Sequence, residues 1–204
     1  MPAPDFDAAI HYALDRLRAE LPPSLTYHNL EHTQEDVMPA AQRLAEACRL
    51  DQDQQQLLAV AAAFHDLGFV CQYEDHEQAG VQLAAAVLPD LGFGEEAIST
   101  IAGLILATRL PSQPETLLQA VLADADLDVL GRDDFLARSQ ALWQEVSTNL
   151  DCSPRPVWLQ EQRAFLQAHR YYTAAARSLR DAGKQRNIQL LDAVIRYKCD
   201  YLAG

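Results

Sequence analysis

The sequence predicts an all-α protein. Almost every segment carries apolar residues with the period of an α-helix, and no stretch shows the apolar/polar alternation of several consecutive strands. The 204 residues include only 8 Gly, and Ala, Leu, Gln and Arg, which favour helix, are frequent. With 49% hydrophobic and 22% charged residues, the chain is typical of a globular protein and long enough for a substantial core.

The first half of the chain divides into helices at proline-rich breaks. A predicted helix over 6–19 ends before Pro22-Pro23, and helices over 33–49 and 54–67 follow. Helices over 74–87 and 95–107 are separated by the segment Pro89-Asp90-Leu91-Gly92. The next predicted helix, over 114–122, follows the turn marked by Pro111 and Pro114.

The second half continues the same pattern. Helices are predicted over 133–146 and 156–169, on either side of Asp151-Cys152-Ser153-Pro154. Gly183 is expected to divide the last stretch into helices over 172–182 and 185–201, because Gly disfavours a helix interior. No linker is long enough to force a second domain, so we expect one domain over 1–204.

The net charge of the chain restricts the kinds of molecule that it can bind. A formal net charge of −13 argues against binding to a nucleic-acid duplex, which depends on Lys and Arg neutralising phosphates. Nine of the 16 basic residues lie between Arg155 and Lys198. This part could bind a small anion, although solvated helix faces explain the same charges.

The location predicted from the sequence is cytoplasmic, without a membrane partner. Acidic residues interrupt residues 1–20, which therefore resemble neither a secretory signal nor a membrane span. The four cysteines are far apart and form no CxxC pair, as is typical of free thiols in a reducing compartment. A homo-oligomer is compatible with the sequence.

The segment AAFHDLG raises the first functional question. Residues 57–64 read LLAVAAAF, a helix too apolar to be exposed, so His65 and Asp66 are expected in the interior. A buried carboxylate requires an ion pair, a hydrogen-bond network or a metal ion.

Two other segments supply similar side chains. In TYHNLEHT, His28 and His32 are four residues apart and share a face if the segment is helical. LADADLDVLG carries Asp124 and Asp126 among apolar residues. Imidazoles and carboxylates together suit Mn, Fe, Zn or Mg. Each segment alone also fits a core histidine, a cap or a turn, and His11 and His169 are expected to be structural.

The order of these residues resembles the HD-domain superfamily of metal-dependent phosphohydrolases. The family pattern is a His, a His-Asp doublet and a distant Asp, which this chain matches with His32, His65-Asp66 and Asp126. The resemblance implies these four as ligands of a divalent metal, with Asp126 preferred to Asp124 because Ala125-Asp126-Leu127 matches the family. It also implies an HD-domain helical bundle, with a core over about 25–132 and additional C-terminal helices over 133–204.

The start YHNLEH is also similar to cyclic-nucleotide phosphodiesterases and to a bacterial group of predicted HD-superfamily phosphohydrolases. This similarity implies that His28 donates a proton to the leaving oxygen, and an acid such as Glu31 or Glu77 would favour its charged form. Glu77 is therefore expected among the catalytic residues with His28 and Asp66. Asp124 is expected to orient a ligand.

The resemblance to the bacterial group covers about 25–190 and has departures. His76 replaces an Asn of the group, so an extra imidazole is expected near the metal. The group's Arg-x-Glu-Tyr reads Trp143-Gln144-Glu145-Val146 here, without the Arg. A later Arg of the group matches Arg163, and Arg163, Arg170 and Arg177 recur every seven residues. The expected substrate contacts are Asp124, His76 and Arg163.

The implied function is hydrolysis of a small phosphorylated metabolite, with nucleotides as the preferred class, by water activated on a divalent ion of Mn, Fe, Zn, Mg or Ni. One tightly held ion is expected, since past residue 76 the chain contains only His169. The alternative is a catalytically weak metal- or nucleotide-binding sensor module on the same fold. A di-iron oxygenase would need more histidines than the chain offers.

Overall fold

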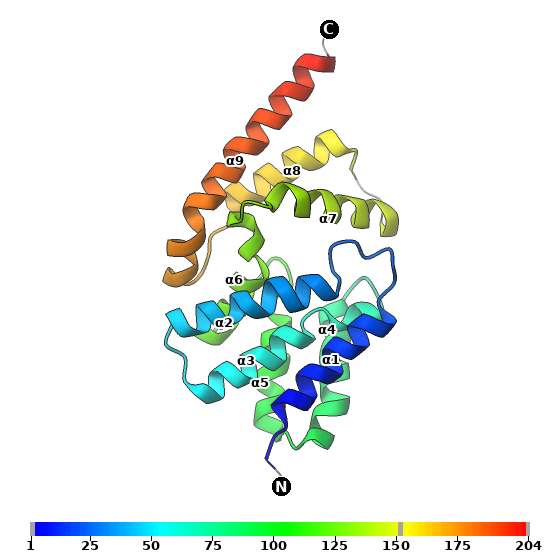
Figure 1. Cartoon of the computed structure of the whole chain (residues 1–204), viewed down its shortest axis with the longest axis vertical. Helices are drawn as coiled ribbons and strands as arrows, with labels where there is room; N and C mark the ends of the chain where they lie inside the picture. Colours follow the sequence, from blue (N-terminus) through cyan, green and yellow to red (C-terminus); the bar gives the residue numbers. More distant parts are fainter. Residues whose placement is uncertain (1–2, 151–152, 203–204) are drawn as a thin grey trace.

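The computed structural model describes residues 3–150 and 153–202, with side chains up to residue 196. Within these residues every regular element is a helix (Figure 1), which confirms the predicted all-α class. The long helices are α1 (Phe6–Glu20), α2 (Met38–Ala47), α3 (Gln52–Phe64), α4 (His76–Val87), α5 (Glu95–Leu106), α6 (Leu117–Asp126), α7 (Phe135–Asn149), α8 (Arg155–Ala168) and α9 (Ala174–Leu202). Short segments are η1 (His32–Val37, a π-helix) and the 3₁₀ helices η2 (Leu67–Val70), η3 (Leu88–Leu91) and η4 (Asp128–Gly131).

The predicted breaks agree with the structure except at Gly183. The Pro22-Pro23, Pro89–Gly92 and Pro111–Pro114 breaks all lie between long helices, and residues 151–152 are outside the described part. The break at Gly183 is wrong, because α9 runs through it. A Cβ atom at Gly183 would lie 1.9 Å from the carbonyl oxygen of Gly131. The glycine therefore permits close packing of α9 on η4, and this packing outweighs its low helix propensity.

The helices form an elongated molecule with two parts along its long axis (Figure 1). Helices α1 to α5 lie in the lower part, α6 in the middle, and α7, α8 and α9 in the upper part. One cluster of buried hydrophobic side chains extends through both parts, from Ala9 and Leu17 of α1 to Leu166 of α8 and Leu191 of α9. The C-terminal helices thus pack on the same core as the rest of the chain.

Local sequence sets the starts of α3 and α6, the helices that carry the His-Asp doublet and Asp126 at or just past their ends. Asp51 accepts from the backbone N–H of Gln54, whose side chain accepts in return from the Asp51 N–H. Thr116 and Gln119 make the same reciprocal pair at α6. Such capping boxes satisfy amide groups that would otherwise lack partners, and so they define where each helix begins.

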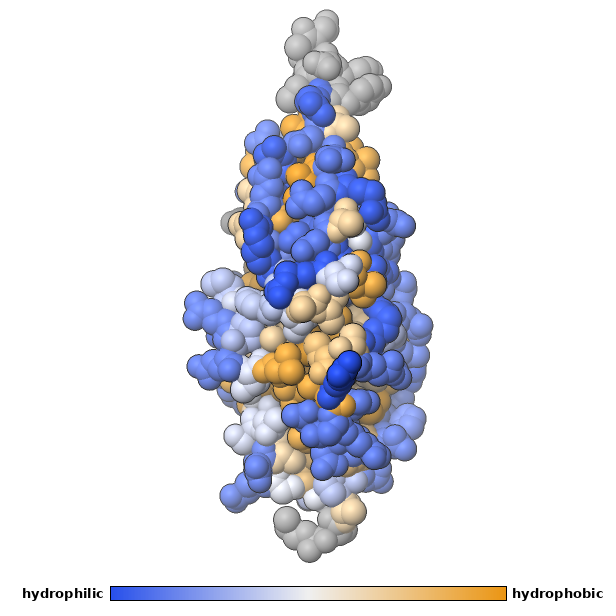
Figure 2. Space-filling view, turned by 90° about the vertical axis from the view of Figure 1, so that its left-hand side faces the viewer, coloured by the Kyte–Doolittle hydropathy of each residue, from blue (hydrophilic) through white to orange (hydrophobic). Residues whose placement is uncertain are grey.

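The surface carries both hydrophobic and hydrophilic areas. On the face in Figure 2, hydrophobic residues gather near the middle of the long axis, while the upper half is covered mainly by hydrophilic residues. In the described part of the chain, no helix is both long and apolar enough to cross a membrane. Cys48 and Cys71 are free thiols. Cys152 and Cys199 are outside the residues whose side chains are described.

Candidate metal centre

His32 begins the π-helical segment η1. Its backbone N–H donates to the side-chain oxygen of Asn29, 3.0 Å away, so the Asn of YHNLEH caps the helical residues Leu30 and Glu31 that lead into this segment. The π-helix passes directly into α2, where Pro39 lacks the amide that a regular helix would use. Single π-helical turns are often found at functional sites. The His32 side chain is 2% exposed.

The doublet His65-Asp66 follows the last residue of α3, and both side chains are buried, as predicted. The Nδ1 atom of His65 lies 2.8 Å from the carbonyl oxygen of Ala62. Because a neutral imidazole has one N–H, donation from Nδ1 leaves the Nε2 lone pair free to bind a cation.

Gly68 of the HDLG motif brings α4 against the doublet. A Cβ atom at this position would lie 1.8 Å from the carbonyl oxygen of His76 and 2.7 Å from the Gly80 nitrogen. Only a glycine allows the two backbones to come this close. The Nε2 atom of His76 consequently lies 3.6 Å from Oδ1 of Asp66 and 3.5 Å from Oε1 of the buried Glu77.

The fold brings the four predicted ligands together from three segments. Oδ2 of Asp66 lies 3.1 Å from Nε2 of His65 and 3.6 Å from Nε2 of His32. Asp126, the last residue of α6, places Oδ1 3.3 Å from Nε2 of His32 and 3.6 Å from Nε2 of His65. We call these four residues the His–Asp cluster.

The donor atoms of this cluster fit a metal ion. Among the described residues, three buried atoms have no hydrogen-bond partner and belong to the cluster: His32 Nε2, His65 Nε2 and Asp66 Oδ2. One ligand atom from each of these residues lies within 4.8 Å of the others. Nitrogen and oxygen ligands bind transition metals at about 2.0–2.2 Å, so donors on opposite sides of one ion are about 4 Å apart. Buried polar atoms without partners are unfavourable, and a cation would satisfy all three.

The electrostatics of the cluster favour a positive charge at its centre. Burial opposes protonation of His32, but Asp126 and Asp36 outweigh it and raise its pKa to about 10. The pKa of His65 is raised by Asp66, again against the effect of burial. Burial also opposes ionisation of Asp66, yet the neighbouring His65 holds its pKa well below the usual range.

His28 has a partner that the sequence analysis missed. Its Nδ1 lies 2.5 Å from Oε1 of Glu145 in α7, whose Oε2 accepts from the backbone N–H groups of Tyr27 and His28. Glu145 is completely buried. Burial opposes its ionisation, but the hydrogen bond from His28 contributes most to a pKa below the usual range. The signal available in the sequence was its match to the Glu of the related group's Arg-x-Glu-Tyr.

The expected acidic partners of His28 are elsewhere, so that expectation is wrong. Glu31 pairs with Arg138, and Glu77 faces His76. The His28 ring instead stacks against Phe69 at 4.7 Å between ring centroids, and Phe69 also stacks against His76 at 3.8 Å. Phe69 thus orients both imidazoles beside the cluster.

The structure does not bring Asp124 or Arg163 to the cluster. Both carboxylate oxygens of Asp124 accept from the backbone N–H groups of Tyr172 and Thr173, at 2.8 Å, and so tie α6 to the start of α9. Arg163 bonds to Asp192 and Gln167, within α8 and α9. Arg170 and Arg177 donate to backbone carbonyl groups of 167, 169, 171 and 172.

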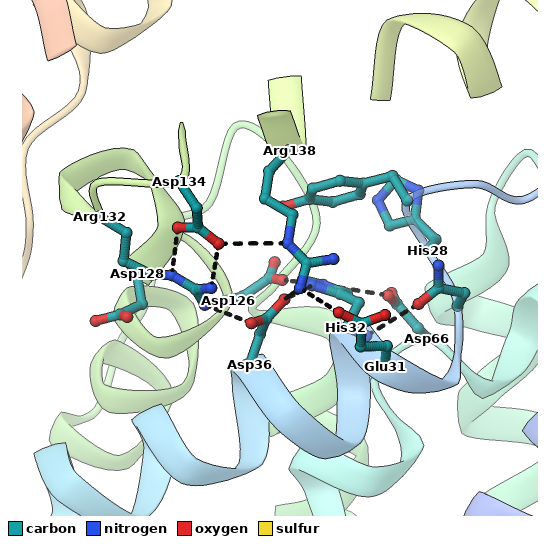
Figure 3. Close-up of polar contacts among 12 residues, drawn as sticks. His28, Glu31, His32, Asp36, Asp66, Asp126, Asp128, Arg132, Asp134 and Arg138 are labelled. Atoms are coloured by element: carbon teal, nitrogen blue, oxygen red, sulfur yellow. Dashed lines mark hydrogen bonds and ion pairs between the residues drawn. The ribbon is translucent and has the colours of Figure 1, made fainter. Parts of the chain in front are cut away.

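A different arginine lies at the cluster. Figure 3 shows Arg138 of α7 extending toward His32, with Arg132, Asp36 and Asp134 beside it. Nη2 of Arg138 lies 2.9 Å from Oε1 of Glu31 and 3.0 Å from Oδ2 of Asp36. Asp36 is also 3.8 Å from Nδ1 of His32. No sequence motif marks Arg138, which is in the first turn of the amphipathic helix α7.

A cavity of about 210 Å³ opens beside the cluster. His28, Asp126 and Arg138 line one part of it. Most of the remaining lining is apolar, with Phe135 and Leu142 from α7 and Phe165 from α8. The C-terminal helices therefore form one wall of a pocket whose polar end includes a residue of the His–Asp cluster.

Comparison with known proteins identifies the fold. No family model matches the chain, and no curated protein matches it. A crystal structure described as a predicted HD superfamily hydrolase, from an uncultured Thermotogales bacterium, is similar with a TM-score of 0.60 and 20% identity, over 97% of this chain and 94% of that one. A crystal structure of a protein from Lactobacillus plantarum gives a TM-score of 0.70 and 16% identity, over 98% and 97%.

These likenesses show the fold of the protein. It is all-α, and its fold is similar to that of the crystal structure described as a predicted HD superfamily hydrolase; the sequence predicted an all-α HD-domain bundle. Within that fold, it carries a buried cluster of His32, His65 and Asp66 that can hold a metal ion.

Proposed function

We propose that the protein is a metal-dependent phosphohydrolase acting on a small phosphorylated metabolite, with nucleotides as the favoured class. The main support is the set of three buried ligand atoms on His32, His65 and Asp66 that make no hydrogen bond. Together with Asp126 they would hold a divalent ion of Mn, Fe, Zn, Mg or Ni. Such an ion, when bound, lowers the pKa of a coordinated water and offsets charge on a phosphoryl group.

His28 is the proposed proton donor to the leaving oxygen. Its Nδ1 contacts Glu145, so Nε2 is the nitrogen that can act on a substrate. Glu145 fixes the ring orientation and stabilises the charged imidazole, as a buried carboxylate does for a catalytic histidine. Glu77 and His76, next to Asp66, would hold the carboxylate in place.

The alternative hypothesis, a catalytically weak sensor module, is less well supported than the enzyme. Its main argument was the absence of the Arg two residues before Glu145. Arg138, at another position on α7, brings a cation to the cavity beside the His–Asp cluster. We therefore favour the enzyme.

The proposed binding partner is a small molecule and not a nucleic acid. A net charge of −13 and a cavity of about 210 Å³ suit a small molecule that binds beside a cation better than a nucleic-acid duplex. We also propose a cytoplasmic location without a membrane partner.

The test combines metal analysis with a substrate panel. Protein purified without chelator should contain about one transition metal per chain and release phosphate from members of a panel of phosphate esters and nucleotides. Asp66→Asn should lose both the metal and the activity, while the exposed Asp90→Asn should keep both. If Asp66→Asn retains its metal and its turnover, the doublet is structural and the proposal fails.

A further inference from the structure

We propose that Arg138 binds a phosphate oxygen of the substrate and that the site accepts a single phosphoryl group. This inference rests on the proposed function, because it assumes a phosphorylated ligand beside the His–Asp cluster. It assigns the substrate-binding cation to Arg138 of α7, whereas the resemblance in sequence indicated Arg163 of α8.

Neighbouring acids hold the Arg138 side chain in place. The side chain is only 16% exposed, and its Nη2 pairs with Glu31 and Asp36. Its Nε lies 3.6 Å from Oδ2 of Asp134. Because these contacts already immobilise the guanidinium, binding an anion would cost little additional side-chain entropy.

The remaining terminal nitrogen of Arg138 is available for a ligand. In the described part of the chain, Nη1 makes no hydrogen bond, whereas Nη2 donates to Glu31 and pairs with Asp36, and Nε pairs with Asp134. Figure 3 shows this nitrogen on the side of His28, away from Asp134 and Asp36. Arg138 and His28 line the same cavity. Charged N–H donors form strong hydrogen bonds with phosphate oxygens, so Nη1 is a suitable anchor for the phosphoryl group.

The cavity limits the organic part of the substrate. Its volume of about 210 Å³ is below the range of about 300–1,000 Å³ typical of pockets that enclose drug-sized ligands. Away from the polar end, the wall carries mainly apolar side chains such as Phe135, Leu142 and Phe165. This wall suits an uncharged, apolar or aromatic group. A group as large as a nucleoside would be only partly enclosed by the cavity.

The charges around the cavity limit the number of phosphates. Among the described lining residues, Arg138 is the only Arg or Lys, and it lies between acidic residues. A phosphate monoester carries about −1.5 to −2 charges at neutral pH. A metal ion and one guanidinium can offset this charge, but the described lining of the cavity offers no second Arg or Lys for a further phosphate. Phosphate monoesters, including nucleoside monophosphates, are thus preferred to triphosphates.

The experiment measures binding of inorganic phosphate by calorimetry to wild type, Arg138→Lys, Arg138→Gln and the control Arg186→Gln, whose arginine is exposed. Metal content and the melting curve are recorded for each. Wild type and the control should bind equally, and both Arg138 variants should bind about 10- to 100-fold more weakly at unchanged metal content. Lys keeps the charge and protects the fold, yet it cannot contact Glu31, Asp36 and a phosphate with one planar group.

The two proposals fail separately. Equal phosphate affinity in wild type and Arg138→Lys, or loss of metal in that variant, would overturn the role of Arg138 even if the enzyme hydrolyses phosphate esters. Phosphate binding that depends on Arg138, without hydrolysis of any ester, would support this inference and refute the proposed function. Equal Michaelis constants for a nucleoside monophosphate and its triphosphate would overturn the preference for one phosphoryl group.

Discussion

The Nδ1 atom of His28 lies 2.5 Å from the Oε1 atom of Glu145, although 117 residues separate the two in the sequence. The same carboxylate accepts from the backbone N–H groups of Tyr27 and His28. Glu145 thus fixes both the loop before η1 and the imidazole that we propose as proton donor. It connects the helical part that carries the His–Asp cluster with the C-terminal helices.

Glu145→Gln should lower kcat with little change in metal content. The amide keeps an acceptor for the backbone N–H groups but cannot stabilise a charged His28, so part of the general-acid contribution of about 10²- to 10⁴-fold should be lost. Steady-state kinetics should show the loss in kcat, with a Michaelis constant close to that of wild type. The exposed Glu96→Gln serves as control, and a wild-type kcat in Glu145→Gln would contradict this role.

Gly183→Ala should destabilise the protein despite the better helix propensity of Ala. The new Cβ would lie 1.9 Å from a backbone oxygen of Gly131, and overpacking of this kind costs about 1–3 kcal/mol. Gly103→Ala is the matched control, because its Cβ would meet only the flexible side chain of Gln119, at 3.3 Å. Urea unfolding should show this control equal to wild type or up to about 1 kcal/mol more stable. Equal stability of the two variants would show that α9 and η4 can separate freely.

Arg163→Lys should leave the Michaelis constant unchanged, contrary to the expectation from sequence. The guanidinium pairs with Asp192 on α9, and both side chains are partly exposed. Partly exposed ion pairs contribute about 0–1 kcal/mol, so the loss of stability should be small. A Michaelis constant that rises in Arg163→Lys while Arg138→Lys behaves as wild type would restore the sequence-based assignment.

His169→Gln should make the protein less sensitive to mild acid. Burial, with the nearby Lys184 and Arg170, lowers the pKa of His169 to about 4. The unfolded chain therefore binds a proton that the folded chain excludes, and the free energy of unfolding falls as the pH decreases from about 6.5 to about 4. Gln can still accept from Lys184, which lies 3.3 Å from Nδ1 of His169. Urea unfolding at about pH 7 and about pH 5 should show a smaller difference for His169→Gln than for wild type or for the exposed His11→Gln.

Sequence alone determined the fold class and the positions where a metal site was to be expected. Helical periodicity is a local property, and the all-α prediction required nothing else. His65 and Asp66 could be placed in the interior because the preceding eight residues are apolar, and both are buried. The HDLG and YHNLEH motifs are local as well, because their residues contact neighbours in the sequence. Gly68 packs against the backbone of His76, and Asn29 accepts from His32.

Tertiary structure alone decided which distant residues complete the candidate site. Arg138 and Glu145 lie on α7, and only the packing of that helix over the cluster brings them to Glu31, Asp36 and His28. Asp124 and Arg163 were equally suitable by residue type, but Asp124 bonds to the residues just before α9 and Arg163 bonds to Asp192 of α9. At Gly183, a local preference of about 1 kcal/mol against helix was outweighed by close packing on Gly131. The physical reason is the same in each case: a side chain's role depends on the surfaces that folding places against it, which no local pattern records.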